Sequence, residues 1–487
     1  MNTIIVSVPG AGKTTAISEY ITEMVKEGVI RPECTYAVTF TREAASELRD
    51  RIRINGVEVS TIHSLAHAVL CTSGGVPDDL SALDNMFYDE LLVRATKEVP
   101  GMVIDLLAID EAQDLSAIQF SFLIELAKIA KHFLIVGDPG QSIFGFQGSD
   151  PKYMSMFEKA KPDVEVLRMG TSYRIPEDLS SYINNTFNPA VRIAPLRQGG
   201  KVDTWVMNEE TIPAAVVNNI KENTGVLVRT NAEIVRLLRV LGSRAAEVNY
   251  SIPLSAHPFV TFASAILCMG TSIPSFELLQ ASNLLGGLSW SSTRALRRMG
   301  DQRFTRQALE DIFGTGRATT TMDPRDMPIV GTKVIKEIYN LVEVLDEYDT
   351  YFGQLDNVSI ANLISRLRSD SYLIEDFWKV GGVSDDELVE AIRRRIFTRS
   401  ELYHTVNVGS TINLMTVHAA KGKEFENVLA VVNHRNVNIY EPEEFRILYV
   451  ACTRSRESLA VFVPTSYSHD RTRANTLDTM NRAAGFI

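Results

Sequence analysis

The sequence has few cysteines, and none of them are closely spaced. Four occur in 487 residues, with no Cys-x-x-Cys pair: Cys34, Cys71, Cys268 and Cys452. Isolated thiols argue against a disulfide framework, a zinc ribbon and an iron–sulfur cluster, because each of these needs clustered cysteines. The same scarcity is typical of reducing compartments, so we expect a cytoplasmic location.

Long apolar runs and an excess of positive charge are also missing. Stretches such as Phe259–Gly270 fall short of the ~18–20 apolar residues that cross a bilayer, so we expect no membrane partner. Sixty acidic residues against 49 basic ones give a net charge of −11, which excludes a uniformly basic nucleic-acid coat. A local basic groove is still compatible with this charge, since phosphate contacts need only a few placed Lys or Arg side chains.

Short apolar runs separated by amphipathic segments dominate the chain and predict an α/β fold with two lobes. The strands expected in the first lobe are Thr3–Ser7, Tyr36–Phe40, Leu106–Ile109 and Phe133–Val136. Those expected in the second are Val164–Arg168, Gly225–Arg229, Ile412–Val417, Val428–Val432 and Leu459–Val463. Helical patterns such as Thr332–Leu345 and Ile360–Leu367 predict a mostly helical insertion. The expected boundaries are 1–165 for the first lobe (with a minimal insertion near 71–105), 166–265 and 405–487 for the second, and 266–404 for the insertion.

A phosphate-binding loop is predicted where a strand, a glycine-rich turn and a helix follow one another. The turn reads SVPGAGKTT, and its expected nucleotide contacts are Pro9, Gly10, Ala11, Gly12, Lys13, Thr14 and Thr15. Small residues let backbone N–H groups face the phosphates, and the helix N-terminus adds partial positive charge. Lys13 is expected to reach the β- and γ-phosphates, and the Thr14 hydroxyl to ligate Mg²⁺. The alternative is a glycine-rich turn that merely caps a helix.

A pair of carboxylates ends the apolar run LLAI. Asp110 and Glu111 are expected at the carboxyl edge of this strand, where Asp110 would hold Mg²⁺ and Glu111 would polarise the attacking water. An apolar run that ends in Asp-Glu is also common in surface turns. Together with the loop at Lys13, the pair predicts binding and hydrolysis of a nucleoside triphosphate.

Further segments, in chain order, resemble the motifs of the UvrD/Rep/PcrA-like helicases of superfamily 1. These segments are Ala37–Leu48, Val59–His67, Asp110–Asp114, Val136–Gly148, Ser172–Arg174, Leu414–Phe425 and Glu443–Arg454. The resemblance implies two RecA-like P-loop NTPase lobes, with the helical domain inserted in the second. It also implies ATP and Mg²⁺ as cofactors, and single-stranded DNA and single-strand/duplex junctions as partners. The choice of DNA over RNA comes from the resemblance alone.

The resemblance also assigns roles to individual residues. Gln141 would sense the γ-phosphate, and Arg174 and Arg454 would meet it across the cleft, unless they are surface or helix-capping arginines. Tyr173 would stack on adenine, with a buried core tyrosine as the alternative, and Glu424 would contact the ribose. The DNA track would contain Phe40, Thr41, His63, Phe146, Thr416 and His418. Phe146 stands where the family usually has tryptophan, and Phe144 is either part of the track or a core residue.

Three functions fit these motifs. The first is an ATP-dependent DNA helicase that translocates 3′→5′ on single-stranded DNA. The second is a translocase that displaces proteins or serves a partner nuclease and unwinds poorly alone, which the short insertion near 71–105 favours. The third is a nucleotide-gated DNA-binding protein, against which the intact catalytic set argues. Two arginine runs are candidate duplex contacts or plain solvated helix faces: Arg294, Arg297, Arg298, Arg303 and Arg306, and Arg393–Arg395.

Overall fold

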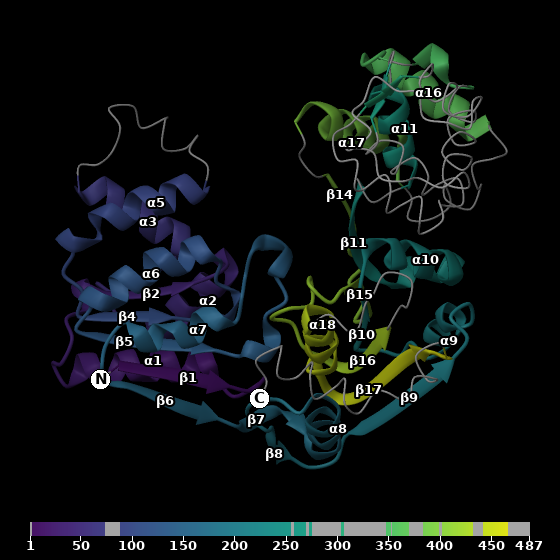
Figure 1. The fold of residues 1–487 in the computed structure, drawn as a ribbon. Coiled ribbons are helices and arrows are strands. Elements are labelled where there is room, and N and C mark those ends of the chain that lie inside the picture. Colours follow the sequence, from purple (N-terminus) through teal and green to yellow (C-terminus); the bar gives the residue numbers. More distant parts are fainter. Residues whose placement is uncertain are drawn as a thin grey trace, which may run out of the picture. The chain divides into compact units, whose positions relative to one another are not determined.

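The computed structural model describes residues 2–73, 88–254, 258–268, 272–274, 303–305, 347–351, 353–369, 383–398, 402–431 and 442–465. The chain divides into two compact units (Figure 1). The first unit comprises Met1–Ile212, Asn219–Arg229 and Val417–Ile487, and the second comprises Pro213–Asn218 and Thr230–Thr416. The sequence-based domain boundaries differ from this division and stay predictions.

The N-terminal part of the first unit is a parallel sheet with helices on both faces (Figure 1). In spatial order its strands are β3 (Glu58–Thr61), β2 (Thr35–Thr39), β4 (Leu106–Ile109), β5 (His132–Gly137), β1 (Asn2–Ser7) and β6 (Val164–Met169). Its helices are α1 (Lys13–Lys26), α2 (Arg42–Ile52), α3 (Ile62–Ser73), α5 (Tyr88–Glu98), α6 (Ala117–Ile129) and α7 (Lys152–Met156). The predicted α/β class is confirmed here.

Alternate residues of the central strands enter two separate cores. Leu107 and Ile109 of β4 pack with α3, α5 and α6 on one face of the sheet. Leu106 and Ala108 pack with α1 and α2 on the other face. Because both faces are covered, the strand is apolar throughout, which is why its sequence reads as a continuous apolar run.

A second parallel sheet of the first unit is built from later segments. In order its strands are β10 (Thr224–Val228), β16 (Phe425–Val431), β17 (Ser455–Pro464) and β9 (Lys201–Met207). The helices α8 (Glu177–Phe187) and α18 (Pro442–Cys452) pack together through Phe187, Phe445 and Tyr449. The short strands β7 (Thr171–Pro176) and β8 (Ala194–Arg197) pair in parallel.

The assignment of Val164–Arg168 to the second lobe is wrong. These residues form β6, which pairs with β1 at the edge of the first sheet, from Asn2 opposite Val164 to Ser7 opposite Met169. An apolar run predicts a strand but not its neighbours, and as an edge strand β6 leaves Val166 and Leu167 exposed.

The second unit combines helices with a small set of strands. Its strands β11 (Asn249–Pro253), β14 (Tyr403–Val406) and β15 (Asn413–Thr416) pair side by side, and β12 (Ser272–Pro274) pairs with β13 (Arg303–Thr305). Its helices are α10 (Asn231–Leu241), α11 (Pro258–Cys268), α16 (Asn357–Ser369) and α17 (Asp385–Phe397), and α9 (Ile212–Asn218) begins at the boundary between the units. The helix predicted at Ile360–Leu367 is confirmed by α16.

Some sequence predictions cannot be compared with the structure. The helix predicted at Thr332–Leu345 and the side chains of the Arg294–Arg306 run lie outside the described residues. Among the residues that are described, no helix combines the length and apolarity needed to cross a bilayer.

A buried aspartate fixes the start of β4. Asp105 is 1% exposed and accepts hydrogen bonds from the Arg31 backbone N–H (3.0 Å) and Arg31 Nε (2.8 Å), with Lys131 Nζ at 2.7 Å. The Arg31 guanidinium holds the pKa of the Asp105 carboxyl well below its usual range. Since this pKa is lower in the folded than in the unfolded chain, the stabilisation is complete above about pH 4 and is lost as the pH falls through the folded value.

We therefore predict that Asp105→Asn lowers the free energy of unfolding by about 1–3 kcal/mol near neutral pH, because buried donors lose a charged acceptor. Urea denaturation of the variant, the parent and the exposed control Asp163→Asn measures this difference. The difference in the free energy of unfolding between the variant and the parent should become smaller as the pH falls from about 7 towards about 3. An equal gap at both pH values would contradict the ionic role of Asp105.

Candidate nucleotide site and nucleic-acid track

The strand order of the first sheet brings its polar motifs to one edge. Since β4, β5 and β1 are adjacent and parallel, their carboxyl ends lie side by side. The glycine-rich loop follows β1, Asp138 follows β5, and Asp110 follows β4. In parallel α/β sheets this edge is where ligands bind.

The glycine-rich loop has the conformation that its sequence predicts. Gly10 and Gly12 have φ values of +72° and +82°, a left-handed region that favours glycine, and Gly12 caps the N-terminus of α1. A Cβ on Gly10 would lie 2.5 Å from Arg174 Cβ, so this position also needs glycine for close approach. Ser7 Oγ donates to the Gly137 carbonyl (3.0 Å), which ties the loop to the end of β5. The loop therefore leads directly into the N-terminus of α1, and phosphate-binding loops use such a helix N-terminus to bind anions.

The two predicted carboxylates lie beside the loop. Thr14 Oγ1 donates to Asp110 Oδ2 (3.3 Å), and Lys13 Nζ lies 3.8 Å from Glu111 Oε1. Burial and the neighbouring Glu111 raise the pKa of Asp110. Burial also acts to raise the pKa of Glu111, but Lys13 and Lys421 outweigh it, so the net shift is downward. Glu111 has φ +53°, a strained conformation for a non-glycine residue.

This oxygen set fits a magnesium ion. A buried carboxylate next to a threonine hydroxyl supplies hard oxygen donors, and a nearby cation would offset the cost of burying the Asp110 charge. Among the described residues, no group of three or more His, Cys, Asp and Glu side chains could form an all-protein cage. Mg²⁺ commonly binds through one or two protein ligands plus phosphates, which suits this edge.

Gln141 and Arg454 meet at the same edge. Both side chains are buried, and Arg454 Nη2 donates to Gln141 Oε1 (2.6 Å). The other end of the amide, Gln141 Nε2, donates to Asp138 Oδ2 (2.7 Å). The structure therefore joins these two predicted residues, although 313 positions separate them in the sequence.

Tyr173 and Arg174 belong to β7 and lie against the glycine-rich loop. The Tyr173 N–H donates to the Gly10 carbonyl (3.0 Å), while its side chain is 64% exposed, which excludes the core alternative. Arg174 pairs with Glu424, which also pairs with Arg456 at 2.5 Å. These residues, the loop, Gln141 and Arg454 line one pocket of about 570 Å³.

Sequence reasoning missed several charged residues of this site, among them Asp138, Asp114 and Lys421. Asp138 is buried next to Gln141, and Lys421 Nζ contacts the Asp114 carboxylate and donates to the Gln141 carbonyl (2.9 Å). Burial raises the pKa of Asp114 to about 6 although Lys421 acts to lower it. Asp138 has the same signal that identified Asp110, an apolar strand that ends in an acid. Lys421 stands inside a recognised motif, but nothing local predicts its partner.

An aromatic group forms beside the nucleotide site. Phe40 stacks on Phe144 at 5.6 Å and 15°, and Phe146 packs edge-on to His418 at 5.5 Å. Phe144 lies 6.0 Å from both Phe146 and His418 and is half-buried, so it belongs to this group. Phe146 is 69% exposed, so its ring is accessible to a ligand. Burial, aided by Arg229, lowers the pKa of His418 to about 4, so this ring is neutral near pH ~7.

The remaining predicted DNA contacts are Thr41, His63 and Thr416. Thr41 caps α2, where its Oγ1 accepts from the Ala44 N–H (3.1 Å). His63 is half-buried on α3, and burial lowers its pKa. Thr416 ends β15 in the second unit, whose placement relative to the first is not defined. DNA contact by these three residues stays a prediction.

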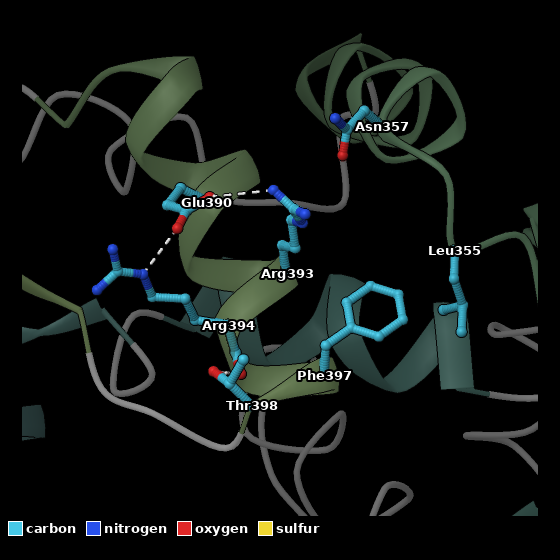
Figure 2. A pocket seen from close by; sticks show the side chains of 7 residues that line it. All are labelled: Leu355, Asn357, Glu390, Arg393, Arg394, Phe397 and Thr398. Atoms are coloured by element: carbon cyan, nitrogen blue, oxygen red, sulfur yellow. Dashed lines mark hydrogen bonds and ion pairs between the residues drawn. The ribbon is translucent and has the colours of Figure 1, made fainter.

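The Arg393–Arg395 run lies in the second unit, on α17. Arg393 and Arg394 pair with Glu390 at 4.0 and 2.7 Å beside the exposed Phe397 (Figure 2). The pocket of about 600 Å³ at this place is lined by Leu355, Asn357, Glu390, Arg393, Arg394, Phe397 and Thr398. Glu390 offsets part of the positive charge, and duplex contact here stays a prediction.

Comparisons with known proteins agree with this geometry. Residues 1–147 match the AAA domain family, and residues 302–466 match the UvrD-like helicase C-terminal domain. The chain belongs to the UvrD-like helicases of superfamily 1. This UvrD-like helicase is 21% identical to a "Probable DNA helicase II homolog" of Rickettsia conorii, over 93% of this chain and 88% of the relative.

Two further relatives cover most of the UvrD-like chain. "ATP-dependent DNA helicase PcrA" of Leuconostoc citreum is 22% identical over 97% of this chain and 81% of the relative. "Gabija protein GajB" of Bacillus cereus is 22% identical over 95% of this chain and 93% of its own length. The predicted family and its two RecA-like lobes are thereby confirmed.

We predict that Gly10→Ala weakens ATP binding by about tenfold or more, because the new Cβ collides with Arg174 and the left-handed backbone is strained. Titration with a fluorescent ATP analogue measures the change. Gly101→Ala is the matched control, since a Cβ there meets nothing within 4 Å. Equal affinity in both variants would show that the loop does not contact nucleotide.

Proposed function

We propose that this chain is an ATP-dependent DNA helicase that couples hydrolysis to 3′→5′ translocation on single-stranded DNA. The observation that carries the proposal is the route from the nucleotide site to the aromatic group. Gln141 and Phe146 stand five residues apart on one segment, so one stretch of backbone joins the buried amide at the nucleotide site to the exposed ring.

For the chemical step we assign each role to a side chain at the strand edge. Thr14 and Asp110 hold Mg²⁺, which neutralises charge on the β- and γ-phosphates when bound. Lys13 binds the same phosphates, and Glu111 orients the attacking water. Arg174 and Arg454 stabilise the charge that develops on the γ-phosphoryl group, and Gln141 reports its presence.

For nucleotide recognition we assign the exposed Tyr173 ring to the adenine. Its backbone is fixed to Gly10, and the residue lines the pocket. The ribose contact predicted for Glu424 competes with the two guanidinium groups that pair with this carboxylate. We propose that nucleotide exchanges one of these ion pairs for the ribose.

For DNA, we propose that bases stack on the Phe146 ring beside Phe40, Phe144 and His418. Base–aromatic stacking is worth about 1–3 kcal/mol per base and tolerates any sequence. Polarity, preference for single-strand/duplex junctions and a cytoplasmic location are further parts of the proposal, supported by the family and by the scarcity of cysteine.

A second candidate is a translocase that displaces proteins or serves a partner nuclease and unwinds poorly alone. One observation favours it. Between the His63 motif and Asp110, the described residues of α3 and α5 pack into the core of the first sheet through Leu65, Val69, Leu92 and neighbouring side chains. The segment near 71–105 thus contributes to the lobe itself, and little of it is left for a separate domain at a duplex junction.

ATP hydrolysis with and without single-stranded DNA tests the proposed function. We predict strong stimulation by DNA in the parent and loss of hydrolysis in Glu111→Gln, with nucleotide binding retained. Lys13→Ala should lose hydrolysis as well. Turnover that DNA leaves unchanged would contradict the helicase proposal, and normal turnover in Lys13→Ala would contradict the nucleotide site.

Strand displacement separates the two candidates. A helicase separates a partial duplex with a 3′ single-stranded tail faster than one with a 5′ tail. A translocase shows DNA-stimulated hydrolysis and displaces streptavidin from a biotinylated strand, but leaves the duplex intact.

We predict that Phe146→Ala reduces the DNA stimulation of hydrolysis by about fivefold or more, while DNA-free hydrolysis changes less than about twofold. The loss should come from weaker stacking, so the DNA concentration for half-stimulation should rise. Val103→Ala, at another exposed apolar side chain, is the control. A parallel fall of both rates would make Phe146 a structural residue.

A further inference from the structure

The segment between the nucleotide site and the aromatic group is held by hydrogen bonds to the backbone of most of its residues. We call Gln141–Gly145 the anchored segment. Lys421 donates to the Gln141 carbonyl (2.9 Å), Arg446 Nε to the Ser142 carbonyl (2.6 Å), and His418 Nε2 lies 3.0 Å from the Ile143 carbonyl. The Gly145 N–H donates to Glu443 Oε1 (2.7 Å).

All these anchors come from two late stretches of the chain. Lys421 and His418 follow β15, whereas Glu443 and Arg446 lie in the first turns of α18. The same helix continues to Cys452, and Arg454 lies two residues beyond its end, after Thr453. Glu443 at the amino end of α18 therefore holds the Gly145 backbone, and Arg454, just beyond the carboxyl end of α18, contacts the Gln141 amide.

The contact at Gly145 is close. A Cβ at this position would lie 2.5 Å from Glu443 Oε2, so the loop approaches the carboxylate as nearly as glycine allows. Gly145 stands between Phe144 and Phe146, two of the four rings of the aromatic group. The Glu443 carboxylate thus fixes the backbone that sets the direction of both rings.

The contact at Ser142 is buried. Arg446 is 8% exposed, and its guanidinium lies against the Ser142 carbonyl. A buried arginine on a backbone carbonyl is costly to desolvate, so its position favours a function other than stability alone.

We propose that Glu443 and Arg446 are positioning residues that transmit movement of α18, set at Arg454 by the nucleotide, to the base-contacting rings. The inference rests on the proposed function and adds the helix as the connecting part. Movement of Arg454 with the γ-phosphate shifts α18, and the Glu443 and Arg446 contacts carry the anchored segment with it. Phe144 and Phe146 then change their grip on the bases.

The test compares Glu443→Ala with Glu443→Gln, which keeps an acceptor oxygen for the Gly145 N–H. We expect Glu443→Ala to reduce DNA stimulation of ATP hydrolysis about tenfold or more, the value of one charge-assisted hydrogen bond. DNA-free hydrolysis should stay within about twofold of the parent. Glu443→Gln should keep at least about half of the stimulation, and the exposed control Glu158→Ala should match the parent.

Each outcome decides between the proposals. A stimulated parent with full stimulation in Glu443→Ala, or with equal losses in the Ala and Gln variants, overturns the inference alone. A parallel loss of DNA-free and DNA-stimulated hydrolysis would show that Glu443 has only a structural role, and this result also overturns the inference. A parent without DNA stimulation overturns the proposed function and the inference with it.

A second measurement does not depend on turnover. Hydrogen–deuterium exchange of a peptide covering residues 138–147 should be faster in Glu443→Ala than in the parent and near the parental rate in Glu443→Gln. Arg446→Met and Arg446→Lys form a second pair, in which the lysine variant keeps a donor for the Ser142 carbonyl. Parental exchange in both Glu443→Ala and Arg446→Met would show that neither residue anchors the segment.

Discussion

The Gln141 amide is hydrogen-bonded at both ends, and the rest of the site depends on this pair of contacts. Its nitrogen donates to Asp138, just after β5, and its oxygen accepts from Arg454, two residues beyond the end of α18. A buried amide that loses one partner leaves a polar atom unsatisfied, so neither contact can change without affecting the other. A γ-phosphate that attracts Arg454 would therefore alter the hydrogen bonds of Gln141 and the position of the loop that follows it.

The parallel order of the first sheet makes this arrangement possible. Consecutive strands in the chain need not be neighbours, yet all their carboxyl ends reach one edge. The loop at Lys13, the acids at Asp110 and Glu111, and Gln141 are thus collected from distant segments. Backbone pairing of the strands rather than side-chain contact sets this arrangement, so the site is assembled at the edge of the central sheet.

Local chemistry determined what the sequence could predict. The glycine-rich loop, the Asp110–Glu111 pair and the strand at Leu106–Ile109 were predictable, because each depends on neighbouring residues alone. The sheet to which Val164–Arg168 belongs was not, since an apolar run does not specify its partner. The Lys421–Asp114 contact joins residues 307 positions apart, and no local pattern encodes such a pair. The anchors of Ser142 and Gly145 were missed for the same reason.

A double-mutant cycle between Gln141 and Arg454 tests most directly whether their contact couples the site. Single-turnover ATP hydrolysis is measured with single-stranded DNA for the parent, Gln141→Ala, Arg454→Lys and the double variant. If the two side chains act as one unit, the double variant is hardly slower than the more impaired single variant, with an interaction energy of about 1–3 kcal/mol. Effects that simply add would show that the two residues act independently and would contradict the account.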